Sequence, residues 1–396
     1  MPLLLSLKPG RDEPLRRRHP WVFGGSVARR AGSSPDGSCE VRGSDGRLLG
    51  RGFASPNAPI AARVWTFDDR PLDAALVRGL LERAVALRAR VVPGETDGYR
   101  VVHAEGDFLP GLVVDRYGAF LAVQATTEGT ERARPLWLPP LRELFGGLTV
   151  IGKNDLPTRR AEGLPTEDEV LAGTAPEGPV PFVERGLRFL ADLASGQKTG
   201  FFLDQRENRH LVREASGGRR VLNLFSYSGA FGVAALAGGA TRVVQVDVSA
   251  RALELARLNH EANGQGVSGP DARVTLAEAD VFDDLRARVA AGESWDLIVT
   301  DPPAFAKRTA DVDRACRGYK DVNRLALKLL APGGTLLACS CSGPVSPDLF
   351  QKVLFAASLD AGVPVRLVER RGAGPDHPVS LDCPESEYLK AFRLER

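Results

Sequence analysis

The sequence predicts an α/β protein: a C-terminal doubly wound parallel sheet, preceded by a small N-terminal β-barrel and a central α+β domain. Three observations carry this prediction. Short apolar runs between turn residues fill positions 1–70, and a mixture of helical and strand patterns fills 71–182. Strands then alternate with helices over 183–396, as in a parallel sheet. We take these three ranges as the expected domains.

The first 70 residues have the spacing of a small barrel or sandwich, with turns rich in glycine, proline, serine and aspartate. The apolar runs are Leu3–Leu7, Trp21–Phe23, Leu48–Phe53 and Ile60–Phe67. This range carries a net charge of +5, whereas the other 326 residues sum to −3. A basic surface is therefore expected near the N-terminus.

The central range opens with an amphipathic helix from Leu72 to Val91, whose apolar residues recur at helical spacing. A second helix is expected at Pro135–Phe145. Strands are expected at Tyr99–His103, Gly111–Asp115, Phe120–Ala125 and Leu148–Lys153. The stretch Gly163–Pro181 is rich in proline, glycine and acidic residues, which predicts a linker or surface loop.

The C-terminal range alternates strands and helices without internal repeats. The expected strands are Arg220–Phe225, Arg242–Asp247, Arg273–Ala277, Leu297–Asp301 and Gly334–Cys339. The expected helices are Ala230–Ala237, Ala250–Asn263, Asp283–Ala291, Asp321–Leu330 and Pro347–Asp360.

Composition excludes several classes. No run of about 18 apolar residues is present, so no transmembrane helix is expected, and the start lacks the apolar core of a secretory signal. Five cysteines without a CxxC pair favour neither a disulfide scaffold nor a metal site, and they suit a reduced, cytoplasmic protein. Arginine outnumbers lysine 44 to 8, which a GC-rich genome explains without nucleic-acid binding.

The ends of the first three C-terminal strands predict a cofactor. Gly229 stands without the other glycines of GxGxxG or of a phosphate-binding loop, which disfavours dinucleotides and nucleoside triphosphates. Asp247, about 20 residues on, stands where a carboxylate accepts both ribose hydroxyls. Asp280 could accept an adenine amino group, with Phe282 beside the ring. Each aspartate alone is more often a strand-end cap; together they predict adenosine without phosphates, hence S-adenosylmethionine.

The ends of the next two strands predict the chemistry. Asp301-Pro302-Pro303-Ala304-Phe305 forms a rigid loop that can aim Asp301 and Phe305 at a flat substrate. Cys341 lies past the apolar run at the same rim, whereas Cys339 is expected to pack inside. A thiolate adding to carbon 6 of cytosine makes carbon 5 nucleophilic, and an acid near ring nitrogen 3 stabilises the adduct.

With these residues in place, nearly the whole chain resembles the bacterial large-subunit ribosomal RNA cytosine-5 methyltransferases. That family has a PUA domain, a central α+β domain and a Rossmann-like class I methyltransferase domain. The stretches that carry the resemblance are Arg18–Phe23, Gly111–Tyr117, Lys198–Arg206, Asn223–Gly229, Asp301–Phe305, Cys316–Asp321, Ser340–Gly343, Asp376–Pro378 and Tyr388–Lys390.

The resemblance implies that Cys341 is the nucleophile. It also implies a group of residues around the cofactor or target base: Asn223, Phe225, Tyr227, Gly229, Asp247, Asp280 and Asp301. Ser226 and Pro302 lie in the same two loops and are counted with the cofactor site. The segment Lys198–Arg206 is either a cofactor-pocket wall, with Gln205 as the expected contact, or a domain-packing element.

Two further groups have competing interpretations. Arg16, Arg17 and Arg18 with Trp21 suit phosphate contact plus base stacking, and a solvated basic run fits equally well. Asp376-His377-Pro378 could assist proton transfer or be an ordinary loop. No residue stands out as the base that removes the carbon 5 proton.

The sequence thus predicts S-adenosylmethionine-dependent methylation of a cytosine in large-subunit ribosomal RNA, either naked or in an assembly intermediate. No membrane partner is expected, and a homodimer is compatible with the sequence. Two alternatives stay open. An amino- or guanine-directed RNA methyltransferase has a related DPPAF loop but needs no thiol. A non-catalytic RNA-binding assembly protein would not need the series from Gly229 to Cys341.

Overall fold

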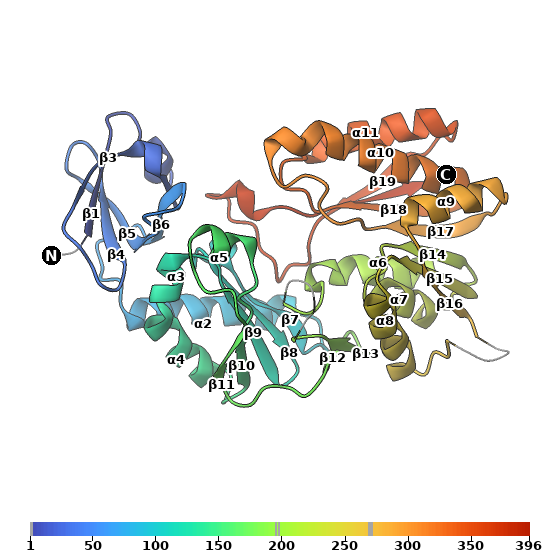
Figure 1. Ribbon diagram of the computed structural model, residues 1–396, viewed down its shortest axis with the longest axis horizontal. Coiled ribbons are helices and arrows are strands. Elements are labelled where there is room, and N and C mark those ends of the chain that lie inside the picture. The colour runs from blue at the N-terminus through green and yellow to red at the C-terminus, as the bar shows by residue number, and fades with distance from the viewer. Residues whose placement is uncertain (1–2, 195, 197–198, 268–271) are drawn as a thin grey trace. The chain divides into compact units, whose positions relative to one another are not determined.

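The computed structural model describes residues 3–194, 196, 199–267 and 272–396 (Figure 1). The chain forms two compact units. The first comprises Met1–Arg185, Ala191–Phe201 and Pro375–Ser386, and the second comprises Gly186–Leu190, Phe202–Gly374 and Glu387–Arg396. Two short segments far along the chain therefore belong with the N-terminal half, an arrangement that the contiguous ranges expected from the sequence do not contain. Among the described residues, no helix is long and apolar enough to span a membrane.

A six-stranded mixed sheet forms the N-terminal part of the first unit, in the order β2-β6-β5-β4-β1-β3. Its strands are β1 (Leu3–Leu7), β2 (Trp21–Phe23), β3 (Val27–Ala31), β4 (Ser38–Arg42), β5 (Leu48–Ala54) and β6 (Ile60–Thr66). The four apolar runs in the sequence are all strands. β3 and β4 were not expected. β3 reads VARRA and exposes three of its five side chains, so it lacks the apolar run that marked the other strands.

A five-stranded sheet in the order β11-β10-β9-β8-β7 forms the centre of the first unit. Its strands are β7 (Gly98–His103), β8 (Leu112–Tyr117), β9 (Phe120–Ala125), β10 (Thr149–Gly152) and β11 (Glu169–Ala172), packed by helices α2 (Ala74–Val91) and α4 (Arg134–Leu144). The expectation of a loop throughout Gly163–Pro181 is wrong at β11. This strand of four residues pairs antiparallel with β10, so its register comes from its partner rather than from its own sequence.

The second unit is built on a seven-stranded sheet in the order β16-β15-β14-β17-β18-β20-β19. Its strands are β14 (Arg220–Leu224), β15 (Arg242–Asp247), β16 (Val274–Glu278), β17 (Trp295–Thr300), β18 (Leu330–Ser340), β19 (Arg366–Arg371) and β20 (Lys390–Glu395). The first five are parallel, as predicted, whereas β20 runs antiparallel to both β18 and β19. Strands β19 and β20 were not expected from the sequence.

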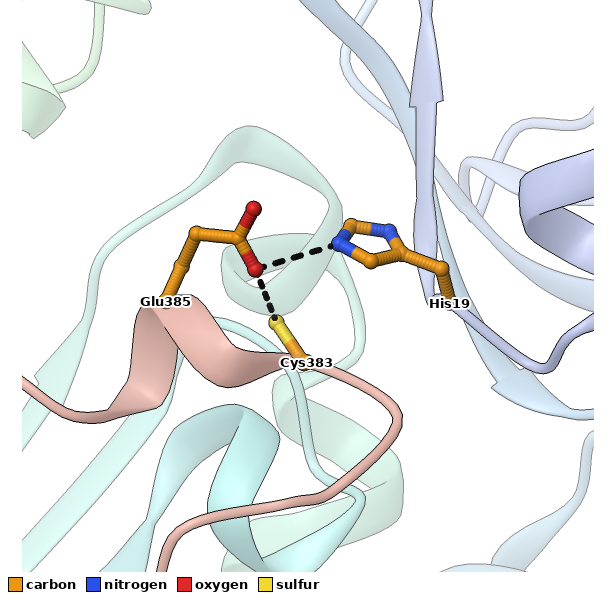
Figure 2. A group of neighbouring side chains, drawn as sticks. All are labelled: His19, Cys383 and Glu385. Atoms are coloured by element: carbon orange, nitrogen blue, oxygen red, sulfur yellow. Dashed lines mark hydrogen bonds and ion pairs between the residues drawn. The ribbon is translucent and has the colours of Figure 1, made fainter.

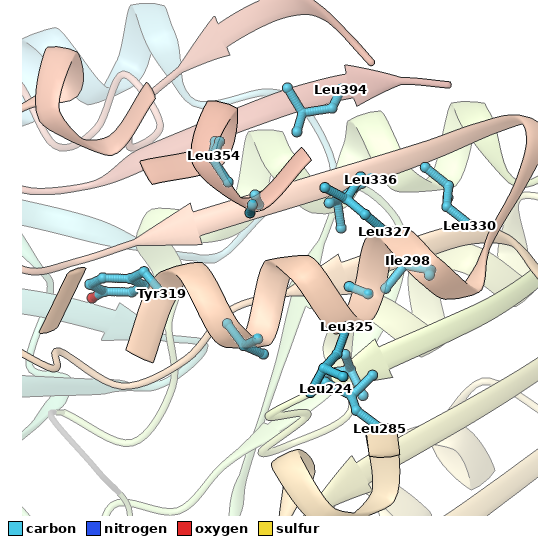
Figure 3. Packing of buried hydrophobic residues seen from close by; sticks show 14 of the residues in the cluster. Leu224, Leu285, Ile298, Tyr319, Leu325, Leu327, Leu330, Leu336, Leu354 and Leu394 are labelled. Carbon is cyan, nitrogen blue, oxygen red and sulfur yellow. The ribbon is translucent and has the colours of Figure 1, made fainter. Parts of the chain in front are cut away.

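Helices cover both faces of this sheet (Figure 1). They are α6 (Arg206–Ala215), α7 (Ala230–Ala237) and α8 (Ala250–Ala262) on one face, and α9 (Val281–Ala290), α10 (Val312–Leu329) and α11 (Pro347–Ala361) on the other. Figure 3 shows the apolar core under the second set, where Tyr319, Leu325 and Leu336 are buried. The predicted doubly wound fold is therefore confirmed.

Helix α10 begins nine residues before the expected Asp321. Its first turns carry Asp313, Arg314 and Arg317 on the outer side, and this polarity hid the helix in the sequence. Its inner side buries Ala315, Tyr319 and Val322 at helical spacing. The early start matters for function, because it places Tyr319 beneath the loop that follows β17.

Candidate active site

The predicted site residues gather at the carboxyl ends of the central strands of the second unit. The strand order changes direction between β14 and β17, and ligands of open α/β sheets bind outside the carboxyl ends at such a switch point. The loops that follow β14, β15, β17 and β18 begin at Phe225, Val248, Asp301 and Cys341. These loops are the parts from which the site is built.

The loop after β14 has an unusual backbone. Phe225, Tyr227 and Gly229 have φ angles of 57°, 44° and 71°, and two of the three are bulky residues in the left-handed region. Such a conformation costs free energy and is concentrated at ligand-binding sites. Gly229 is required on two grounds: its φ, and the 2.6 Å that would separate a Cβ there from the Ala256 side chain.

Asp247 lies at the end of β15 and holds this loop. Its Oδ2 accepts the Tyr227 N–H at 2.8 Å, and its Oδ1 accepts the Ser249 N–H at 3.0 Å. Each carboxylate oxygen has a second acceptor site, so the group can still receive a pair of ligand hydroxyls. Ser226, in the same loop, is buried, and its Oγ has no hydrogen-bond partner in the described part of the chain. A polar ligand would satisfy that hydroxyl, so these residues fit the ribose and amino acid groups of S-adenosylmethionine.

Asn223 occupies a supporting position. Its side chain is 1% exposed, and its Nδ2 donates to Gln245 Oε1 at 2.7 Å. Gln245 Nε2 in turn donates to the Gly229 carbonyl at 3.1 Å and lies 2.5 Å from His260 Nε2. Burial lowers the pKa of His260 to about 4, which keeps it neutral. Asn223 is thus part of a buried network under the loop, and in this geometry it holds the Gly229 turn rather than presenting its amide to solvent.

Asp280 has the capping role that is common for a strand-end aspartate. Its Oδ1 accepts the N–H groups of Phe282 and Asp283 at 2.9 and 3.2 Å, at the start of α9. The side chain is exposed, and Oδ2 is not used in these bonds. The Phe282 ring lies 6.4 Å from both Phe225 and Phe305, so an aromatic row joins the loops after β14, β16 and β17.

Asp301 and Cys341 come together at the ends of β17 and β18. Gln205 Nε2 donates to Asp301 Oδ2 at 2.9 Å, and Gln205 Oε1 accepts from Asn208 Nδ2 at 2.6 Å. Gln205 is only 2% exposed, so this contact fixes the orientation of the Asp301 carboxylate. Cys341 Sγ lies 4.0 Å from the carbonyl oxygen of Pro302, the residue after Asp301.

The two cysteines of this strand have different environments. Cys339 is fully buried among apolar residues, and burial, followed by the charge of Asp301, raises the pKa of its thiol well above the ordinary value. Cys341 lies one residue past the end of β18 and is half-buried. A thiol must ionise to act as a nucleophile, so Cys341 is the better candidate.

A second network ties the loops after β17 and β18 together. Tyr319 Oη and Ser342 Oγ are 2.8 Å apart, and the Ala306 N–H donates to Ser342 Oγ at 3.0 Å. The Phe305 ring packs at 4.7 Å from the Tyr319 ring and is half-buried. Phe305 is therefore anchored on α10 while part of its surface stays accessible. Sequence reasoning found Phe305 but assigned no role to Tyr319 or Ser342.

Lys390 is the functional candidate that sequence reasoning overlooked. This lysine is 4% exposed at the start of β20, opposite Ser340 of β18, and its Nζ donates to the carbonyls of Ser342 and Tyr388 at 2.7 Å each. Burial lowers its pKa to about 8, and the neighbouring Cys341 opposes that shift. The sequence contains one hint, because Tyr388–Lys390 is among the stretches that carry the resemblance, although no role was assigned to Lys390.

The predicted RNA contacts other than Phe305 lie in the first unit and are already paired. Arg16 bonds Asp12 and Asp45, Arg17 pairs with Glu13, and Arg18 lies 3.8 Å from Asp382. Arg17 and Arg18 nevertheless keep side-chain exposures of 77% and 60%. Trp21 donates its indole N–H to Glu105 at 2.9 Å and is half-buried, so only part of its ring is available for stacking.

The Asp376-His377 pair is buried within the first unit. Asp376 accepts the Arg100 N–H at 3.0 Å, and its carbonyl accepts from Arg88 at 2.7 Å. These bonds support the ordinary-loop interpretation. Lys198, at the start of the predicted pocket-wall segment, lies outside the described residues.

His19, Cys383 and Glu385 form a cluster that resembles a metal site (Figure 2). His19 Nε2 lies 3.3 Å from Glu385, and Cys383 donates to the same carboxylate at 3.6 Å. The tautomer of His19 argues against a metal. The backbone N–H of Trp21 donates to His19 Nδ1, so the ring proton lies on Nε2. A metal-binding histidine has the opposite arrangement. The cluster is a hydrogen-bonded structural contact.

Comparisons with known proteins agree with this geometry. Residues 166–393 match the family model for S-adenosylmethionine-dependent methyltransferases, and residues 5–67 match a PUA-like domain. The chain is 42% identical over 395 residues to a protein named ribosomal RNA large subunit methyltransferase I from Serratia proteamaculans, and 43% identical over 395 residues to one of the same name from Aeromonas salmonicida. In both comparisons 99% of each chain is covered.

Solved structures share the fold over the full length of the chain. A Streptococcus mutans protein described as a SAM-dependent methyltransferase superposes with a TM-score of 0.84 at 22% identity, covering 100% of both chains. A methyltransferase structure solved with SAH superposes with a TM-score of 0.85, again at 22% identity and 100% coverage. At this identity the likeness concerns the fold.

Proposed function

Because this chain belongs to the family of S-adenosylmethionine-dependent methyltransferases, we propose that it methylates carbon 5 of a cytosine in large-subunit ribosomal RNA, with Cys341 as the nucleophile. The observation that carries the proposal is the position of the Cys341 thiol. It lies past the end of β18, beside the Asp301 loop and a buried lysine. A methyl transfer to nitrogen would need no thiol at this position.

The substrate class rests on the relatives. Those from Serratia and Aeromonas are named as ribosomal RNA large subunit methyltransferases and match this chain from end to end. A PUA-like domain and the exposed arginines 17 and 18 agree with an RNA partner. The target nucleotide and the assembly state of the RNA are matters for methylation mapping.

The cofactor supplies an electrophilic methyl group, and the residues after β14 and β15 would hold it. Asp247 would accept hydrogen bonds from the ribose hydroxyls, and Ser226 has a hydroxyl without a partner in the described structure. Phe225 and Phe282 offer ring surfaces. Asp301, oriented by Gln205, lies where a carboxyl group can support the cytosine ring at nitrogen 3.

Cys341 performs the covalent step. Its thiolate adds to carbon 6, which places electron density on carbon 5, and carbon 5 then takes the methyl group. Loss of the carbon 5 proton expels the thiolate and restores the aromatic ring. Lys390 contributes by holding a positive charge near the sulfur, which favours the thiolate over the thiol.

The test uses RNA with 5-fluorocytosine at the target position. Fluorine cannot leave as a proton does, so a carbon 6 adduct persists as a protein–RNA complex. Wild-type protein should form this complex, and Cys341→Ala should lose both the complex and methylation while keeping S-adenosylmethionine binding.

Cys339→Ala is the matched control, because both cysteines belong to one strand and only Cys341 lies at its open end. It should keep trapping and activity. A Cys341→Ala protein that methylates at the wild-type rate would instead support a nitrogen-directed methyltransferase. A dead Cys339→Ala protein with normal folding would show that the wrong thiol was chosen.

A further inference from the structure

A pocket of about 310 Å³ lies within the first unit, between β6 and the loop after it, helix α2, the η2 turn (Ala104–Asp107) with the loop after it, and the segment 375–386. Its walls include the rings of Trp65, Phe67 and Phe108, and its rim includes three arginines and three carboxylates. The volume is at the lower end of the range for small-ligand pockets, about 300–1,000 Å³. No step of the proposed reaction uses this pocket.

The aromatic side chains of the pocket differ in how exposed they are. Phe108 is 49% exposed and has a φ of 59°, an uncommon conformation for a bulky residue. Trp65 is 4% exposed, and its Nε1 has no hydrogen-bond partner among the described residues. That nitrogen has almost no accessible surface, so Trp65 closes the pocket as an apolar wall, and Phe108 is the ring that stays open to a ligand.

The charges on the rim leave one cation available. Arg18 pairs with Asp382 and lies 5.3 Å above the Phe67 ring, and Arg70 pairs with Asp68. The third carboxylate, Glu105, accepts the indole N–H of Trp21. Arg83 on α2 is exposed, and the described structure gives it no ion-pair or hydrogen-bond partner. It can therefore bind an anionic group at the mouth of the pocket.

We propose that this pocket takes an unstacked nucleobase of the RNA substrate, other than the target cytosine. Single-stranded RNA is recognised by stacking splayed bases on aromatic rings, by hydrogen bonds to base edges, and by arginine contacts to phosphates. The rings of Phe108 and Phe67 stack on the base, and Arg83 holds its 5′-phosphate. The proposal depends on the proposed function only in taking RNA as the partner.

The experiment uses the full chain with saturating S-adenosylhomocysteine, which closes the cofactor site to nucleotides. GMP is titrated and followed by calorimetry, with ribose 5-phosphate as the probe that lacks a base. GMP should bind and ribose 5-phosphate should not. Phe108→Leu keeps an apolar side chain but removes the ring, and it should weaken GMP binding by about fivefold or more, as expected for lost base stacking. Arg83→Gln should weaken binding to a similar extent.

Arg90→Gln is the matched control, because Arg90 is exposed on the same helix and does not line the pocket. It should leave GMP affinity unchanged. Cys341→Ala should also leave it unchanged, so failure of the cytosine-5 chemistry and failure of this pocket are separate outcomes. The proposal is overturned if GMP and ribose 5-phosphate bind alike, if neither binds, or if Arg83→Gln has no more effect than Arg90→Gln.

Discussion

Replacing Lys390 by methionine tests whether this buried charge activates Cys341. The ordinary pKa of lysine is 10.5, and burial lowers that of Lys390 to about 8. At 1.36 kcal/mol per unit, the charged form costs the fold up to about 3 kcal/mol at neutral pH. The unfolded state binds more protons between about pH 8 and 10.5, so this cost is fully present below pH 8 and disappears above 10.5. Because the buried Lys390 ammonium destabilises the fold, we expect it to have a functional role.

We expect that the charge of Lys390 lowers the pKa of the Cys341 thiol. A neighbouring positive charge lowers the pKa of an acid by about 1–3 pH units. Lys390→Met should therefore move the midpoint of Cys341 alkylation by iodoacetamide upward by about one unit or more. Below the midpoint, the alkylation rate should fall about tenfold per unit. Methylation should fall with it.

The assay reads the Cys341 peptide by mass spectrometry across the pH range in which thiols titrate. Lys390→Arg keeps the charge and should restore the wild-type profile. Lys328→Met removes an exposed lysine from the same unit and should change nothing. An unchanged midpoint in Lys390→Met would refute the electrostatic role, whatever happens to methylation, because alkylation needs neither RNA nor cofactor.

Three other predictions follow from the same contacts. Asp247→Asn should weaken S-adenosylmethionine binding by about tenfold or more, since charge-assisted hydrogen bonds are lost; calorimetry with an unchanged affinity would contradict the ribose assignment. His260 has a folded pKa of about 4 against 6.5, so the unfolded state binds more protons between these values and stability falls by up to about 3 kcal/mol as pH drops through that window. Urea unfolding should show that His260→Asn lacks this part of the pH dependence. Neutralising Arg16, Arg17 and Arg18 should flatten the log–log salt dependence of RNA binding; an equal slope would mean that these arginines do not contact phosphate.

The sequence determined the architecture and the chemistry at the ends of strands. Apolar runs of strand length alternating with amphipathic helices specify a parallel sheet, because a strand buried on both faces must be continuously apolar. Asp247, Asp301 and Cys341 follow directly after such runs, so their place at one edge of the sheet could be read without coordinates. Short or polar elements could not be predicted in this way. β3, β11 and the start of α10 take their structure from their neighbours.

Only the tertiary structure decided which residues surround Cys341 and which support the cofactor loop. Lys390 comes near Cys341 because β20 pairs antiparallel with β18, and hydrogen bonding between strands 50 residues apart leaves no local trace in the sequence. Asn223 was predicted to lie around the cofactor or target base, and that stays a prediction; its pairing with Gln245 depends on the register of β14 and β15. Side-chain type and spacing fix the chemistry available to each strand end, whereas long-range register fixes which groups meet and in what electrostatic environment.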